Sequence, residues 1–224
     1  MSHVSMAVAL LAIAAPAAAE TAEDRQLWFN VNVSGTTSSG FAYLAEVQPR
    51  FFEDAGRLGQ VDARGAIGWR LSPSVTAYGG YVHSFLPIEG ARDRNEERLF
   101  AQLSWSVGKV GGGTLSSRTR LEHRQRNNGD DTGWRVREML RYVHKLTTPE
   151  KTRALVSVEA FAALNDTDWG ANAGFDQVRS FAGVEVPIAG KSTLELGYLN
   201  QTINDPGRRL RMNHIASVAL FIRP

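Results

Sequence analysis

Residues 116–126 read Ser116-Ser117-Arg118-Thr119-Arg120-Leu121-Glu122-His123-Arg124-Gln125-Arg126. Every second residue, from Ser116 to Arg126, is polar, and all of these except Ser116 are charged. Successive side chains of a β-strand point to opposite faces, so this spacing collects the charges on one face. The run therefore predicts a strand with one strongly charged face.

Alternation of apolar and polar residues recurs along the chain, in segments separated by turn residues. These segments are longer than the roughly 5–6 residues usual for globular strands, and they match the roughly 9–11 residues with which a tilted strand crosses a bilayer. We expect no helix, and we expect strands at residues 26–34, 41–52, 60–71, 75–85, 97–108, 114–126, 134–145, 152–164, 175–187, 192–202 and 211–222.

The connections between these segments alternate in length. Those at 71–74, 110–113, 146–151 and 189–191 are short, whereas those at 52–59, 86–96, 127–133, 165–174 and 204–210 are longer and polar. Short turns at one end and long loops at the other are typical of outer-membrane barrels. We therefore expect the short turns in the periplasm and the long loops outside the cell.

The number of strands leaves one question open. The second to eleventh segments make ten strands, which close with antiparallel neighbours, and the first segment then starts on the outer side. Either a strand is missing from this assignment, or residues 26–34 lie in the lumen, or they pair in parallel. The fold class expected is all-β, an antiparallel transmembrane barrel of 10–12 strands in the outer membrane.

The N-terminal segment indicates export. Residues 1–19 contain no Asp, Glu, Lys or Arg, and an apolar run from Met6 to Ala15 precedes Ala17-Ala18-Ala19. This pattern predicts a signal peptide over 1–19 and a single mature barrel domain over 20–224. No later stretch reaches the ~18 apolar residues of a membrane-spanning helix.

Composition excludes several classes of function. The chain has no cysteine, which rules out disulfide scaffolds, thiolate metal sites and cysteine nucleophiles. Its 25 basic and 23 acidic residues give a net charge of +2, which lends no support to nucleic-acid binding. The expected partners are outer-membrane lipids and small anionic solutes.

The charged face is the candidate functional site. Charges on the lipid side of a barrel wall cost about 2–4 kcal/mol each at the membrane midplane, so they are expected in the lumen. A soluble barrel with an apolar interior is the alternative. The predicted lumen-lining cluster is Arg118, Arg120, Glu122, Arg124, Arg135, Arg137, Arg141, Glu159, Arg179, Glu185 and Glu195, with Glu46, Arg50, Arg64 and Arg70 around it.

Two interpretations of this cluster remain open. Arginine and carboxylate side chains pair bidentately, so the cluster can form an ion-paired plug that fixes strand register. Surplus arginine can instead select anions in a narrow pore or binding site. Aromatic residues near strand ends are expected to form an interfacial girdle: Trp28, Phe51, Trp69, Phe85, Trp105, Trp134, Tyr142 and Tyr198.

Ordered motifs also resemble a known family. They are Glu97-Arg98-Leu99-Phe100-Ala101-Gln102-Leu103, Arg118-Thr119-Arg120-Leu121-Glu122-His123-Arg124, Phe175-Asp176-Gln177-Val178-Arg179, Leu194-Glu195-Leu196-Gly197-Tyr198-Leu199-Asn200-Gln201 and Asn213-His214-Ile215. In this order, from about Trp28 to Ile222, they resemble the bacterial family called domain of unknown function 2490. The resemblance implies an outer-membrane barrel and carries no catalytic residues. The chain departs from such barrels by ending in Arg223-Pro224 rather than in an aromatic residue.

Catalysis and metal binding receive little support. An outer-membrane lipid-modifying enzyme is an alternative function, but adjacent His83 and Ser84 would point to opposite faces of a strand. His123, His144 and His214 fall on faces that look lipid-facing. The loop acids Asp130-Asp131 and Asp166-Thr167-Asp168 match no ion-binding spacing. We therefore expect no enzyme, cofactor or metal, and a structural envelope barrel or narrow solute channel.

Overall fold

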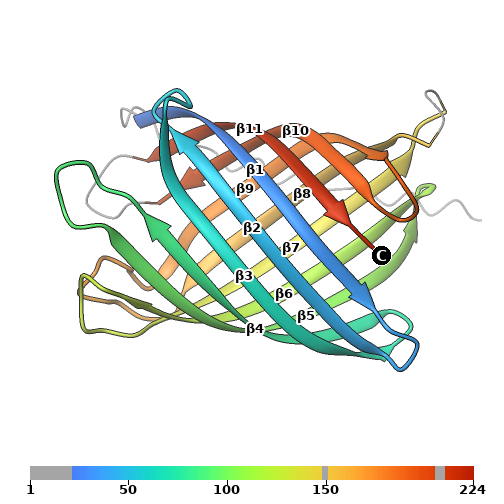
Figure 1. The fold of residues 1–224 in the computed structure, drawn as a ribbon, viewed down its shortest axis with the longest axis horizontal. Coiled ribbons are helices and arrows are strands. Elements are labelled where there is room, and N and C mark those ends of the chain that lie inside the picture. The colour runs from blue at the N-terminus through green and yellow to red at the C-terminus, as the bar shows by residue number, and fades with distance from the viewer. Residues whose placement is uncertain (1–21, 148–150, 205–209) are drawn as a thin grey trace, which may run out of the picture.

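The computed structural model describes residues 22–147, 151–204 and 210–224, so the predicted signal peptide over 1–19 lies outside the described residues. Within them, eleven tilted strands close into a barrel in which each strand lies beside its sequence neighbours (Figure 1). The strands are β1 (Ala22–Thr36), β2 (Phe41–Phe52), β3 (Arg57–Ser72), β4 (Val75–Leu86), β5 (Arg94–Val110), β6 (Gly113–Arg126), β7 (Gly133–Lys145), β8 (Arg153–Ala163), β9 (Gly174–Pro187), β10 (Thr193–Ile203) and β11 (Arg211–Ile222).

The predicted all-β barrel of 10–12 strands is confirmed. Strands β2 and β11 have the predicted bounds, and most others are a few residues longer. The longest, β5, begins at Arg94 because its ladder with β4 continues to the pair Leu86 and Arg94. The described residues contain no helix long and apolar enough to cross a membrane.

The first strand closes the barrel in parallel. Strand β1 pairs with β11 from Ala22 opposite Arg211 to Val33 opposite Ile222, both running in the same direction. Among the three possibilities left open, the first segment is thus a wall strand that pairs in parallel, and all other neighbouring pairs are antiparallel. An odd ring of strands cannot alternate direction all the way round, so one neighbouring pair must be parallel.

The two ends of the barrel differ in their connections. The connections β4–β5, β6–β7, β8–β9 and β10–β11 lie at one end, called here the long-loop end, and the shorter turns lie mostly at the other, the short-turn end (Figure 1). The expected long loop over 52–59 is wrong, because β2 and β3 are joined by a turn at 53–56. Glu53, Asp54 and Ala55 have φ of 57°, 56° and 63° in this turn, and the Glu53 and Asp54 amides donate to the Asp24 carboxylate.

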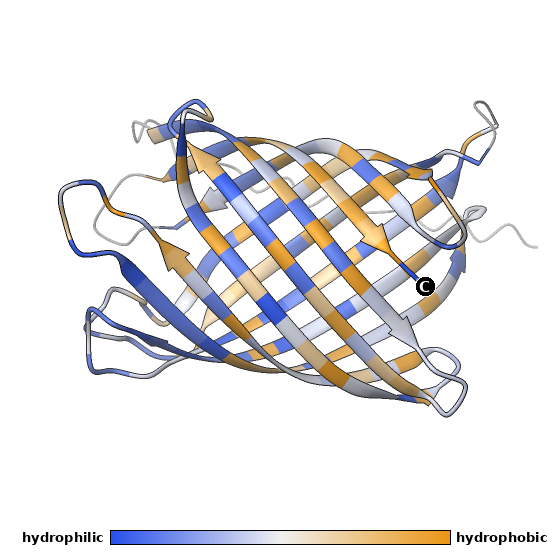
Figure 2. Ribbon diagram, in the orientation of Figure 1, coloured by the Kyte–Doolittle hydropathy of each residue, from blue (hydrophilic) through white to orange (hydrophobic). Residues whose placement is uncertain are grey.

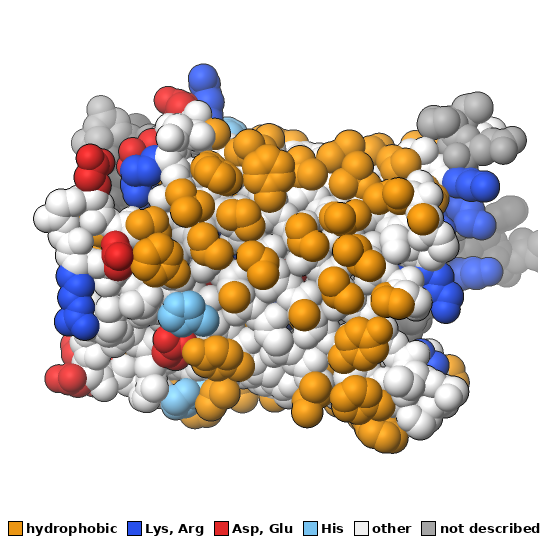
Figure 3. Space-filling view, in the orientation of Figure 1, with side chains coloured by type: hydrophobic (Ala, Val, Ile, Leu, Met, Phe, Trp, Pro, Cys, Tyr) orange, Lys and Arg blue, Asp and Glu red, His pale blue; other side chains and the backbone are white. Residues whose placement is uncertain are grey.

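The outer face of the wall is apolar. Ile67, Leu99 and Val158 have exposed fractions of 64%, 60% and 50%, and hydrophobic side chains cover the middle of the barrel while charges gather at its two ends (Figure 3). Hydropathy alternates along each strand, because every second residue faces inward (Figure 2). An apolar outer band is what a barrel surrounded by lipid requires.

The predicted aromatic girdle is wrong at Trp28. Trp69, Trp105, Trp134 and Tyr198 are exposed on the outer face, as expected of interfacial residues. Trp28 is only 3% exposed and lines the lumen instead. The reason is its register, because Trp28 alternates in step with Gln26, Asn30 and Asn32, which form the polar face of β1.

Candidate functional site

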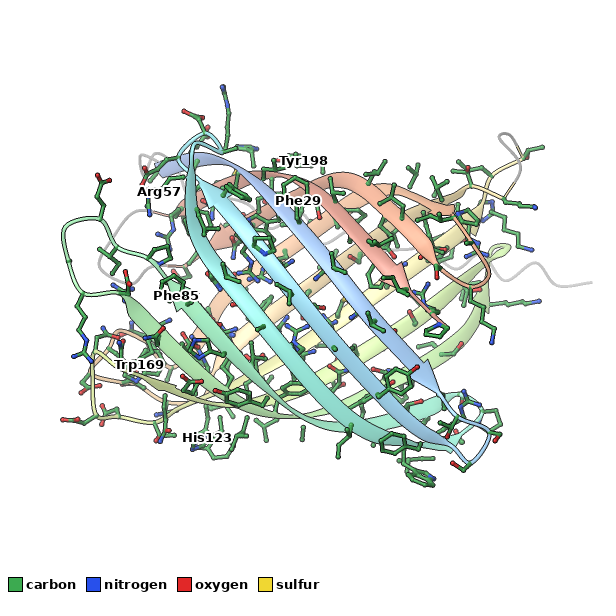
Figure 4. The ribbon with its side chains drawn as sticks, in the orientation of Figure 1. Phe29, Arg57, Phe85, His123, Trp169 and Tyr198 are labelled. Atoms are coloured by element: carbon green, nitrogen blue, oxygen red, sulfur yellow. The ribbon has the colours of Figure 1, made fainter. Side chains whose placement is uncertain are left out.

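The lumen contains a cavity of about 1320 Å³ lined by side chains from all eleven described strands. Its lining extends from Ile88 and Trp169 at the long-loop end to Ser106 and Arg223 at the short-turn end. Charged and polar side chains form most of its lining, and their nitrogen and oxygen atoms can be followed along the barrel interior (Figure 4). The barrel thus encloses a polar space rather than a packed apolar core.

The structure brings the predicted cluster together on the luminal face. Glu122 is fully buried beneath its arginine partners, and Glu185 lies at the short-turn end of the wall. The other predicted residues line the large cavity: Arg118, Arg120, Arg124, Arg135, Arg137, Arg141, Glu159, Arg179 and Glu195. Of the surrounding candidates, Glu46, Arg50 and Arg64 also line it, whereas Arg70 is exposed.

Glu122 on β6 is the centre of the largest ion-pair group. It accepts hydrogen bonds from Arg135 (2.6 Å) and Arg137 (2.8 Å) on β7, and Arg120 lies 3.7 Å away. Arg137 also contacts Glu159 on β8 at 2.8 Å, and Arg118 reaches the same carboxylate at 2.8 Å. The in-register pairing of β6, β7 and β8 places these side chains beside one another. A buried charge is tolerated only when paired in this way.

Two further carboxylates bind arginine side chains on the part of the wall nearer the long-loop end. Glu96 on β5 accepts from three arginines, Arg98, Arg124 and Arg126, each at 2.6 Å. Asp62 on β3 accepts from Arg50 at 2.7 Å, and also from Gln60 and Ser84. The paired charges tie β2, β3, β5 and β6 together across the lumen.

The short-turn end has a separate and balanced group. Arg141 on β7 contacts Glu195 at 2.7 Å and Glu185 at 3.0 Å, and Arg153 donates to Glu185 as well. Two arginines therefore meet two carboxylates at this end. Arg223, which also lines the cavity at this end, adds one further positive charge.

The rest of the lumen carries surplus positive charge. The ion pairs of this region join nine arginines to six carboxylates, and Arg179 lies beside them as a tenth arginine. The arginines are Arg50, Arg64, Arg98, Arg118, Arg120, Arg124, Arg126, Arg135, Arg137 and Arg179, and the carboxylates are Glu46, Asp62, Glu96, Glu122, Glu159 and Asp176. Because arginine stays protonated in proteins, this region is positively charged.

Several arginine nitrogens in this region lack hydrogen-bond partners within the described chain. Arg120 is 1% exposed and donates to Gln102 at 2.9 and 2.5 Å, but its Nη1 has no acceptor. The Nε atoms of Arg64, Arg118 and Arg179 are also buried without an acceptor. Buried polar groups are normally satisfied, so these donors on the cavity wall remain available to bind water or an anion.

The mouth at the long-loop end is partly covered by the β8–β9 loop. Its Trp169 lies over the guanidinium groups of Arg126 and Arg124, with ring-centroid distances of 4.4 and 5.1 Å (Figure 4). The Trp169 Nε1 donates to the Asp131 carbonyl at 2.7 Å, and Asp168 accepts from the Asp131 amide. The loop acids thus hold two loops together, and the described residues include no cluster of three or more potential metal ligands.

Another ion pair lies at this mouth. Arg57, which begins β3, donates two hydrogen bonds to Glu53 in the adjacent turn. These bonds lower the pKa of the Glu53 carboxyl below its ordinary value, so Glu53 is ionised at neutral pH. The pair contributes no net charge at the entrance.

The histidines considered for catalysis lie on the outer face. His83 contacts Glu97 at 2.8 Å, His214 contacts the Tyr198 hydroxyl at 2.6 Å, and His123 packs edge-on against Trp134 (Figure 4). Ser84, the neighbour of His83, is buried in the lumen and donates to Asp62. His83 and Ser84 therefore lie on opposite sides of the wall and form no base–nucleophile pair.

Several residues of the site were missed in the sequence. Asp62, Glu96 and Arg98 have the same alternation as the charged face of β6, but their strands also contain many glycine and apolar residues, which dilute the pattern. Their positions, on the face formed by every second residue of β3 and β5, could have identified them. Trp169 lies in a loop with no periodicity, so no pattern could have placed it in the mouth.

A closed barrel with an apolar outside and a charged lumen is a transmembrane β-barrel, and the fold and the site assign the chain to this class. More specifically, it belongs to the family described as protein of unknown function DUF2490, whose model matches residues 25–213. The resemblance seen in the sequence motifs is confirmed by this match.

Two individual proteins are similar to the chain. An uncharacterised protein of Methylorubrum extorquens is 43% identical over 219 residues, covering 96% of this chain and 94% of that protein. A solved structure of the NanC porin has a TM-score of 0.48 and 12% identity, covering 79% of this chain and 86% of the porin chain. The porin is too distant for its function to be transferred.

Proposed function

We propose that the protein is an outer-membrane channel whose narrow, arginine-lined lumen passes small anionic solutes. The observation that carries the proposal is the cavity whose lining extends between both ends of the barrel and contains more arginine than carboxylate. Positive side chains that line a pore attract anions and repel cations. The lumen would therefore favour solutes with a negative charge.

The outer membrane of a Gram-negative bacterium is the proposed location. The predicted signal peptide over 1–19 supports export. The exposed apolar band on the outer face supports insertion among lipids, which would be its structural partners. Fractionation of cells should find the protein in the outer membrane, and recovery from the soluble periplasm would favour a ligand-binding periplasmic barrel instead.

A planar lipid bilayer containing the purified protein tests the channel directly. In a KCl gradient, the reversal potential should show that chloride permeates better than potassium. Absence of any conductance would favour a structural barrel in which the ion pairs of Glu122 and its neighbours seal the lumen, and a preference for potassium would contradict the proposal.

Variants of three arginines in the cavity wall extend this test. Arg118, Arg120 and Arg137 line the cavity, so replacing all three with alanine should widen the path and raise the conductance. The same change removes three positive charges, so the anion preference should fall at the same time. An unchanged current would show that these side chains do not obstruct the path.

The enzyme alternative is tested separately. Incubation of the folded protein with phospholipid or lipopolysaccharide should release no fatty acid if the barrel acts only as a channel. Hydrolysis that depends on the folded protein would support a lipid-modifying enzyme. The location of His83 and Ser84 on opposite sides of the wall is the structural reason to expect none.

A further inference from the structure

We infer that Arg179, held between the rings of Trp28 and Phe161, is the residue that binds the carboxylate or phosphate group of a solute inside the lumen. The inference deepens the proposed channel function by naming one binding site and the chemistry it recognises. It rests on three features of Arg179: its missing carboxylate partner, its stacking and its accessibility.

The first feature is the missing partner. Arg179 on β9 lies directly opposite Glu159 on β8, the position at which a cross-strand ion pair would be expected. Glu159 instead receives hydrogen bonds from Arg137 and Arg118, both at 2.8 Å. Within the described chain, no carboxylate lies within 4.0 Å of the Arg179 guanidinium, and no hydrogen bond from it is formed.

The second feature is the stacking. The Arg179 guanidinium lies 5.1 Å from the ring centroid of Trp28 and 4.7 Å from that of Phe161. Trp28 comes from β1 and Phe161 from β8, so rings from separate parts of the wall hold the group in place. Stacking occupies the flat faces of a guanidinium and leaves the N–H groups on its edge free to bind an oxyanion.

The same rings bring further positive charge to the site. Arg50 lies 4.2 Å from the Trp28 ring, and Arg137 lies 4.4 Å from the Phe161 ring. Arg50 and Arg179 thus lie against one ring and Arg137 and Arg179 against the other, while Glu159 is already bound by Arg137 and Arg118. Like charges held this close repel one another in a region shielded from bulk water, and a bound anion would relieve that repulsion.

The third feature is accessibility. Arg120, Arg137 and Arg179 all line the cavity, but Arg120 and Arg137 are only 1% and 5% exposed, whereas Arg179 is partly exposed. A solute moving through the lumen can therefore reach Arg179 without displacing a protein ion pair. Its planar fork of donors matches the two oxygens of a carboxylate or of a phosphate.

Calorimetric titration of the detergent-solubilised full chain measures the binding itself. Titration with sodium acetate and with sodium phosphate, at fixed ionic strength, should show saturable binding of one or both anions. Arg179→Gln should weaken this binding about tenfold or more, because a charge-assisted bidentate contact is lost. Whichever anion binds more tightly identifies the oxyanion preferred by the site.

A matched control separates site chemistry from net charge. Arg57→Gln removes the same unit of charge at the mouth, where Arg57 is paired with Glu53, and should retain the affinity of the wild-type protein within about twofold. Arg179→Lys keeps the charge in the lumen but loses the planar fork, so its affinity should still fall severalfold. Gel mobility of unheated samples verifies that each variant is folded.

Bilayer recordings then distinguish the site from the channel. In wild-type protein, the bound oxyanion should block chloride current in a saturable manner, and Arg179→Gln should abolish this block. If wild-type protein binds the anion but conducts no current, the channel proposal fails while the site stands. Absence of saturable binding in wild-type protein, or unchanged affinity in folded Arg179→Gln, would overturn the inference.

Discussion

At the scale of single residues, the lumen depends on carboxylates that are each shared by several arginines. Glu122 has no exposed surface and contacts Arg135 and Arg137 directly, with Arg120 slightly farther away. Removing such a carboxylate leaves several buried arginines without an opposite charge. The resulting loss of stability is far larger than the stability that the ion pair contributed. The shared carboxylates are therefore the points at which the interior is most sensitive to change.

Glu122→Gln should lower the free energy of unfolding by about 3–5 kcal/mol, because a neutral amide cannot compensate the neighbouring arginines. Urea titration in lipid vesicles, followed by the gel mobility of the folded barrel, measures this loss. Glu53→Gln is the matched control, because the Glu53 side chain is 65% exposed and its pair with Arg57 should contribute less than about 1 kcal/mol. Equal stability of the two variants would contradict the role assigned to Glu122.

The charged face was predictable at this scale, but the pairing within it was not. Alternation alone places Arg118, Arg120 and Glu122 on one face, since it depends only on the strand period. Which arginine reaches which carboxylate depends on contacts between strands that are not neighbours, such as Arg141 with Glu195 on β10. For the same reason no sequence pattern shows that Arg179 lacks a partner.

At the scale of strands, the inner and outer faces of β4 differ in how tightly they are packed. A Cβ atom added at Gly80 would meet Phe100 at 2.4 Å and the Gly65 carbonyl oxygen at 2.6 Å. The adjacent Gly79 faces outward and has no atom within 4 Å of such a Cβ. Phe100 in turn lies against the guanidinium of Arg120, so the close approach at Gly80 supports the charged interior.

Gly80→Ala should destabilise the barrel by about 1–3 kcal/mol, because the backbone oxygen of Gly65 cannot move away easily. Gly79→Ala should change the stability by less than about 0.5 kcal/mol, as expected at a surface position without such contacts. Unfolding titrations of both variants compare two neighbouring residues of one strand. A destabilisation that is the same for both would contradict the difference in packing.

The parallel junction of β1 and β11 can be tested by cross-linking. The chain has no cysteine, so an introduced pair reacts without background. Val31→Cys combined with Leu220→Cys places two thiols on paired, outward-facing positions, and oxidation should link them, because neighbouring strands lie about 4.8 Å apart. Electrophoresis under reducing and non-reducing conditions detects the link.

The control for this experiment is a pair outside the register. Val31→Cys with Ala216→Cys separates the thiols by four residues along β11, roughly 13 Å, so no link should form. Equal cross-linking of both pairs would show that the junction is mobile or that its register differs.

The number of strands could be predicted from the sequence, but the pairing that closes the barrel could not. The eleven segments were recognisable because each has a clear alternation bounded by turn residues. Parallel pairing of β1 was one of several possibilities, since the local pattern of 26–34 is the same for a strand in either direction. The tight turn at Glu53, Asp54 and Ala55 was also missed, because three consecutive non-glycine residues with positive φ have no sequence signature.

At the scale of the whole molecule, the near-neutral net charge conceals an uneven distribution. The 25 basic residues nearly balance the 23 acidic ones over the whole chain, but the cavity lining contains more arginine than carboxylate. The potential inside the barrel is therefore expected to be positive although the total charge is close to zero. Net charge alone would have concealed the property on which the proposed channel depends.

The anion preference of the proposed channel should weaken as salt rises. The screening length falls from about 10 Å at 0.1 M to about 3 Å at 1 M, so mobile ions increasingly shield the luminal arginines. Reversal potentials measured at a fixed KCl ratio, over this range of concentration, should show a falling chloride-to-potassium permeability ratio. A ratio that is independent of salt would contradict an origin in the luminal charge.

The parallel junction also determines on which side of a membrane each end of the described chain lies. Ala22 begins β1 at the long-loop end, and Ile222 ends β11 at the short-turn end, so the described chain makes an odd number of crossings. In the proposed orientation, with the short turns in the periplasm, Ala22 lies at the cell surface together with the long loops. Insertion therefore requires an extra translocation of polypeptide, a step that an even-stranded barrel avoids.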